Sequence, residues 1–142
     1  MQKPLQCLLV LVLSGCTTAT DGLTDNSASR ELSSPAASAI AGDLVSRLAE
    51  QVGPGTNTIK LNEDASPFGQ AMEAALKGWG YAVSTDQKID EKKRPLEFAY
   101  AVDDFEGQAL VRISAGSIEL ARAYATSATG ASPASPVSVR RN

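Results

Sequence analysis

The residues with reactive side chains are few, and the two cysteines are the most informative of them. Cys7 and Cys16 both lie near the start of the 142-residue chain, and the sequence contains no histidine. A catalytic group built on histidine is therefore excluded, as are a cysteine zinc site and a disulfide in the body of the chain. Neither a P-loop nor a GxGxxG motif occurs. We therefore predict no enzymatic activity, no metal and no cofactor.

Three carboxylates form the other group with chemical potential. Asp103, Asp104 and Glu106 surround Phe105 and precede Gly107. Converging acids would suit a hard cation or a glycosidase-type hydrolase. The same residues are typical of a hairpin turn, and the spacing of an EF-hand loop is absent. We favour the turn, with a carboxylate hydrolase as the alternative that requires a cleft.

A targeting segment precedes Cys16. Lys3 gives a positive start, residues 5–13 are mostly apolar, and residues 14–15 are small. This order is that of a secretory signal peptide. The apolar run has about nine residues, whereas a membrane-spanning helix needs roughly 20. A cut at another position, with Cys16 incidental, is the competing interpretation.

The segment Leu13-Ser14-Gly15-Cys16 resembles the bacterial lipobox. That resemblance implies removal of the signal peptide 1–15 and a diacylglycerol thioether on Cys16, which would make the membrane a partner of this chain. Each buried methylene contributes about 0.8 kcal/mol to such an anchor, and stable attachment takes more than one chain. By the same resemblance, Thr17 in place of an aspartate implies the outer membrane and a periplasm-facing domain.

The rest of the chain divides by composition into three parts. Residues 16–34 are mostly small and polar, which predicts a flexible tether, with an extended segment that becomes ordered on a partner as the open alternative. Residues 35–125 carry the apolar periodicity of a globular domain. Residues 126–142 form a Ser/Pro-rich tail, and the sequence leaves open whether 137–141 makes a short edge strand.

The domain is predicted to be a small two-layer α+β fold. Ser-Pro pairs at 34–35 and 66–67 each begin a stretch with apolar residues at helical spacing. Apolar and polar residues alternate through much of 98–125, as in antiparallel strands. We expect the order α-β-α-β-β-β, with two helices on one face of a mixed sheet.

Three side chains are candidate partner contacts. Trp79 suits an interface anchor or a core position, and Arg112 and Arg122 suit either a partner's carboxylate or a plain surface position. Lys92, Lys93 and Arg94 form either a docking patch or, with their acidic neighbours, a solvated loop. The formal net charge of −3 gives no reason to expect direct binding of nucleic acid.

The sequence resembles the TrbH family of conjugal-transfer lipoproteins over most of its length. The likeness is carried by Cys16, Phe68-Gly69 with Ala74-Ala75-Leu76, Gly80-Tyr81-Ala82-Val83, and Leu120-Ala121-Arg122-Ala123-Tyr124. It implies a structural component of a type IV secretion (mating-pair formation) apparatus, which tethers or stabilises the outer-membrane core complex for plasmid DNA transfer. The fold implied is similar to secretin N-terminal domains.

The expected partners are the membrane and other secretion-channel subunits, without a small-molecule substrate. We hypothesise that a sheet edge or the tail pairs with a partner by strand addition. The alternative is an unrelated periplasm-facing binding lipoprotein with an envelope or exclusion function.

Overall fold

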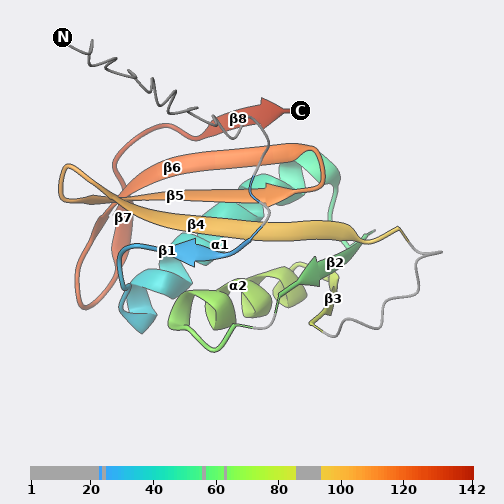
Figure 1. Cartoon of the computed structure of the whole chain (residues 1–142), viewed down its shortest axis with the longest axis horizontal. Helices are drawn as coiled ribbons and strands as arrows, with labels where there is room; N and C mark the ends of the chain where they lie inside the picture. The colour runs from blue at the N-terminus through green and yellow to red at the C-terminus, as the bar shows by residue number, and fades with distance from the viewer. Residues whose placement is uncertain (1–22, 24, 56, 63, 86–93) are drawn as a thin grey trace, which may run out of the picture.

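The fold consists of two helices that lie on one face of an eight-stranded mixed sheet (Figure 1). The computed structural model describes residues 23, 25–55, 57–62, 64–85 and 94–142. The predicted α+β class and the placement of both helices are confirmed. The predicted order has four strands and is wrong in this count, because the structure has five central strands and three short strands at the ends of the chain.

Each helix begins at a serine that caps it. Helix α1 (Ser34–Val52) is capped by Ser33, whose Oγ accepts from Ala36 N at 3.2 Å, one residue before the predicted start. Helix α2 (Pro67–Gly78) is capped by Ser66 in the same way, with Gly69 N at 3.1 Å. These hydroxyls satisfy backbone N–H groups that have no partner within the helix. α1 ends at Gly53, at a φ of 82° that favours glycine.

The central strands are parallel on one side of the sheet and antiparallel on the other. They are β2 (Thr58–Leu61), β3 (Ala82–Ser84), β4 (Leu96–Phe105), β5 (Gln108–Ala115) and β6 (Ile118–Thr126). β3, β2 and β4 run parallel in that order, and β4, β5 and β6 form an antiparallel meander. Glu106 and Gly107 join β4 to β5 with positive φ at both positions, as a type I′ turn requires.

Short strands tie both ends of the chain to this sheet. β1 (Ser27–Ala28) pairs in parallel with β4. β7 (Ala131–Pro133) and β8 (Ser138–Arg141) both pair with β6, along the edge that β5 leaves free. The described part of the expected tether 16–34 and the expected tail 126–142 therefore contribute strands to the sheet. The region 137–141, left open by the sequence, holds β8.

The core lies between the two helices and the sheet. The largest fully buried side chains are Tyr124, Ile40, Leu44, Leu48, Ile59, Met72, Leu76, Ile113, Leu120, Val45, Val102 and Val111. Leu32 belongs to the same cluster, and Val137 packs against it. Both ends of the described chain thus contribute apolar surface to one core. Among the described residues, no helix has the length and apolar character needed to cross a membrane.

Candidate partner-binding surfaces

Arg122 lies on the inner face of the sheet and contacts groups of its own chain. Its Nη1 is 3.0 Å from Asp43 Oδ2 on α1, and its Nε donates to Ser135 O at 2.8 Å. Only 15% of its side chain is exposed. Because a buried cation needs a compensating charge and hydrogen bonds, these contacts explain an arginine on an otherwise apolar strand face. The structure thus gives Arg122 an internal role in place of the candidate partner contact.

Tyr124 completes this buried cluster. Its hydroxyl donates to Asp43 Oδ2 at 2.7 Å. Burial raises the pKa of Tyr124 above its ordinary value, and the hydrogen bond and negative charge of Asp43 raise it further. Asp43 therefore accepts from a phenol and pairs with a guanidinium, which links α1 to β6 from inside the protein.

Arg112 lies on the opposite, outer face of the sheet. It is directly opposite Ala101 of β4 and Ala121 of β6. Its Nη2 is 3.4 Å from Asp103 Oδ2, and 38% of its side chain is exposed. An ion pair this exposed is readily exchanged for another carboxylate, because its net free energy is small. Arg112 therefore remains accessible to a partner.

Trp79 is the C-cap of α2 and one of three exposed large apolar residues among those described. Its side chain is 43% exposed, whereas its backbone N–H bonds back to the last turn of the helix. The other two, Phe105 and Val139, lie in β4 and β8 respectively. Trp79 thus has the exposure that an interface anchor needs, and its backbone is fixed.

The three acids of the β4–β5 hairpin do not form a site. Asp103 pairs with Arg112, and Asp104 pairs with Arg30 at 3.1 Å. Glu106 occupies the turn itself. No group of three or more potential metal ligands occurs among the described residues. The arrangement matches the predicted turn and supplies no converging pair of carboxylates at the hairpin.

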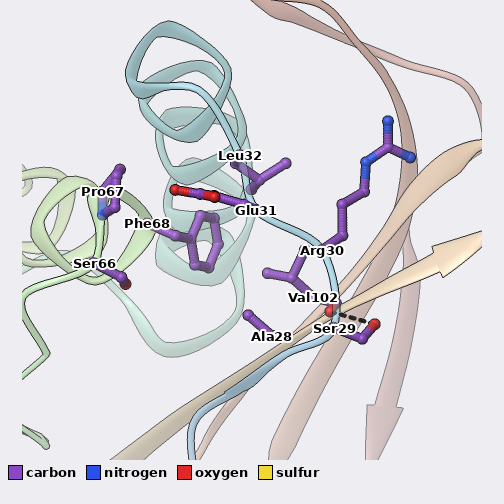
Figure 2. Close-up of a pocket in the computed structure, with 9 residues that line it drawn as sticks. All are labelled: Ala28, Ser29, Arg30, Glu31, Leu32, Ser66, Pro67, Phe68 and Val102. Carbon is purple, nitrogen blue, oxygen red and sulfur yellow. Dashed lines mark hydrogen bonds between the residues drawn. The ribbon is translucent and has the colours of Figure 1, made fainter.

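A groove of about 390 Å³ opens between the segment before α1 and the start of α2 (Figure 2). Its lining is Ala28, Ser29, Arg30, Glu31, Leu32, Ser66, Pro67, Phe68 and Val102. Phe68 turns its ring toward this space (Figure 2). The same ring packs edge-on against Tyr100 of β4, which is not part of the lining, with ring centroids 4.7 Å apart. The Arg30 side chain points away from the groove in Figure 2, toward Asp104 and Thr126.

The groove is suited to contact rather than to acid–base chemistry. Glu31 is the one carboxylate in its lining, and the sole cation, Arg30, is engaged elsewhere. General acid–base catalysis needs groups that converge on a reacting atom. The groove has no signal in the sequence, because Arg30–Leu32 has the composition of a tether and this segment is held by partners about 70 or more residues away.

Comparison with known proteins decides the family. The family model described as "Conjugal transfer protein TrbH" matches residues 18–142. A "Probable conjugal transfer protein TrbH" of Sinorhizobium fredii is 54% identical over 134 residues, which cover 92% of this chain and 90% of that protein. The chain belongs to the TrbH family. No solved structure matches it.

Membership of the TrbH family confirms the predicted resemblance and supports a role in conjugal transfer. The likeness to secretin N-terminal domains stays a prediction. Cys16, the predicted lipid site, lies outside the described residues, as do Lys92 and Lys93 of the charge cluster read as a docking patch or a solvated loop. Trp79, Arg112 and the groove are distinct surface features, and Arg122 is part of the interior.

Proposed function

We propose that this member of the TrbH family is a lipid-anchored structural component of a conjugative type IV secretion apparatus. Cys16 carries the lipid, the outer membrane holds the anchor, and the domain faces the periplasm. There the domain tethers or stabilises the core complex through other channel subunits, without catalysis. Family membership supports the conjugal-transfer part of this proposal. The matched region begins at residue 18, two residues after the proposed lipid site.

The packing of the N-terminal segment against the sheet supports the proposal that the anchor holds the domain close to the membrane. Leu23 O accepts from Ser114 Oγ of β5 at 3.3 Å, and Asn26 Oδ1 accepts from Tyr100 N of β4 at 3.2 Å. The contacts of the folded domain thus begin at Leu23, which precedes the start of α1 at Ser34 by 11 positions.

This packing limits the distance between lipid and domain. From Cys16 to Leu23 the chain advances by seven residues, which span at most about 25 Å when fully extended. A tether ending at residue 34 would reach more than twice as far. The proposed anchor therefore holds the domain close to the membrane, where a short tether gives a high effective concentration for neighbouring subunits.

Fractionation of cells that carry Cys16→Ser tests this proposal. We expect the substituted protein to move from the detergent phase to the soluble periplasmic fraction and plasmid transfer to fall to the level of a deletion strain. Cys7→Ser is the matched control, because it removes a thiol from the discarded segment and leaves both readouts unchanged. Retention of the Cys16→Ser protein in the membrane would contradict the anchor, and normal transfer would contradict the need for it.

A further inference from the structure

Strand β8 is an edge strand whose outer side is open. All four of its residues, Ser138–Arg141, are exposed, and it pairs only with β6 among the described strands. Such an edge presents backbone N–H and C=O groups that another extended chain is able to pair with. In Figure 1, β8 lies along one margin of the sheet, away from α2.

The strand is held in place by contacts at its C-terminal end and by the residue directly before it. Asn142 N donates to Ser117 O at 2.8 Å, and Arg141 Nη2 donates to Gln51 Oε1 of α1 at 2.8 Å. Val137, directly before the strand, packs against the core. Because β8 is already extended and fixed, it loses little conformational entropy when a partner strand pairs with it.

The ladder alternation shows which backbone groups point outward. Residue 142 bonds to residue 117, and hydrogen-bonded pairs alternate with non-bonded pairs in an antiparallel ladder. Ser138 and Arg140 therefore use their backbone groups toward β6. Val139 and Arg141 direct theirs away from β6, toward the open side.

The charges on this edge are positive and lack acidic partners. Six described cations form ion pairs with carboxylates: Arg30, Arg47, Lys60, Lys77, Arg112 and Arg122. Arg140 and Arg141 instead donate to the amide oxygens of Asn142 and Gln51. Glu119 is opposite Arg140 in the register, but the two form no ion pair. Two adjacent cations therefore remain available to a partner's carboxylates.

We propose that β8 receives an extended, acidic segment of another transfer subunit by strand addition. The outward backbone groups of Val139 and Arg141 supply the hydrogen bonds, and Arg140 and Arg141 select acidic side chains. A second copy of this chain is disfavoured, because self-pairing would bring four arginines together. The inference rests on the proposed function only in naming the partner as a transfer subunit.

A peptide-binding measurement tests the inference on the purified, lipidated full chain in detergent. The probes are short labelled peptides of Val and Thr with two adjacent Glu, or two adjacent Lys, at their centre, because Arg140 and Arg141 lie on opposite faces of the sheet. We expect the Glu peptide to bind at least about tenfold more tightly, and Arg140→Glu with Arg141→Glu to remove that preference. Lys60→Glu with Lys77→Glu is the control, because it changes the net charge equally on other elements and leaves binding intact.

A backbone variant separates strand addition from simple charge attraction. Val139→Pro removes one outward N–H while leaving the β6 ladder bonds, so we expect binding to be lost with an unchanged circular dichroism spectrum. Val139→Thr retains the N–H and retains binding. Equal binding of both peptides, unchanged binding by Val139→Pro, or a dimer that Val139→Pro abolishes would each overturn the inference. If the binding results overturn this inference while Val139→Pro still fractionates with the membrane, the proposed lipid anchor remains supported and only strand addition fails.

Discussion

Asp43 of α1 and Arg122 of β6 form an ion pair across the helix–sheet interface, with Arg122 Nη1 3.0 Å from Asp43 Oδ2. The same arginine donates to Ser135 O in the segment between β7 and β8. One guanidinium therefore connects the first helix, the last long strand and the C-terminal segment, whose strand β8 forms the proposed docking edge.

Removal of either partner of this pair is expected to destabilise the fold. Asp43→Ala and Arg122→Ala should each lower the free energy of unfolding by about 2 kcal/mol, below the cost for a fully buried pair because both side chains are partly exposed. In a double-mutant cycle by urea unfolding, we expect a coupling of about 1 kcal/mol. Asp103→Ala and Arg112→Ala are the matched controls, with coupling below about 0.5 kcal/mol because that pair is more exposed. Equal coupling in the two cycles would contradict the structural role of Arg122.

Stability is expected to fall at alkaline pH partly through Tyr124. Its pKa is raised in the folded chain, above all by burial and then by Asp43, whereas the unfolded chain keeps the ordinary value of 10.0. The unfolded state therefore loses this proton first. The contribution to stability is complete below pH 10 and declines as pH rises toward the folded-state pKa, by up to about 1.4 kcal/mol per pH unit.

Urea unfolding on either side of pH 10 measures this effect. Tyr124→Phe should lower stability at neutral pH, because Asp43 loses a donor, and should make the alkaline decline shallower. Burial also raises the pKa of Tyr81, so Tyr81→Phe is the comparison and should reduce the decline as well. An alkaline decline as steep in Tyr124→Phe as in the natural chain would contradict the buried phenol.

The main elements were predictable because their signals are local. Both helices have an apolar residue every third or fourth position and a Ser-Pro start, and β4 to β6 alternate apolar and polar residues. The strands β1, β7 and β8 have no such signal, since they are two to four residues long and most of their side chains are exposed. Their position depends on pairing with β4 and β6, which sequence periodicity does not encode.

The site residues show the same dependence on distant partners. Arg122 had the pattern of a surface residue because Asp43, its partner, is 79 positions earlier in the chain. The groove next to Phe68 was missed because Arg30–Leu32 is held by β4 and the hairpin after it. Trp79 and Arg112, in contrast, lie in elements that the local sequence pattern predicts. Their side chains are exposed, as the predicted contacts require.

Two glycines in the helices should respond oppositely to alanine. A Cβ on Gly69 would lie 2.7 Å from Asp64 Cβ and Cγ, so Gly69→Ala should cost about 1–3 kcal/mol through displacement of Asp64. Gly42 in α1 has no atom within 4 Å of that position, and Gly42→Ala should stabilise by roughly 0.5–1 kcal/mol. Thermal unfolding measures both. Stabilisation by Gly69→Ala would contradict the close approach at the start of α2.

Truncation of the C-terminal segment should damage the fold as well as any interface. A chain that ends at residue 126 lacks β7 and β8, the packing of Val137 and the Ser135 acceptor of Arg122. It also exposes the edge of β6. We expect a lower unfolding midpoint in urea and a tendency to aggregate, measured by light scattering. Unchanged stability would contradict the pairing of this segment with β6.

The proposed function depends most on the lipid at Cys16, and mass spectrometry of the N-terminal peptide tests for that lipid directly. Protein purified from the membranes of its host is digested, and the peptide that contains Cys16 is identified. We predict a mature chain that begins at Cys16, lacks residues 1–15 and carries the added mass of acyl chains. A peptide that continues upstream of Cys16, or one with an unmodified Cys16 thiol, would contradict the anchor.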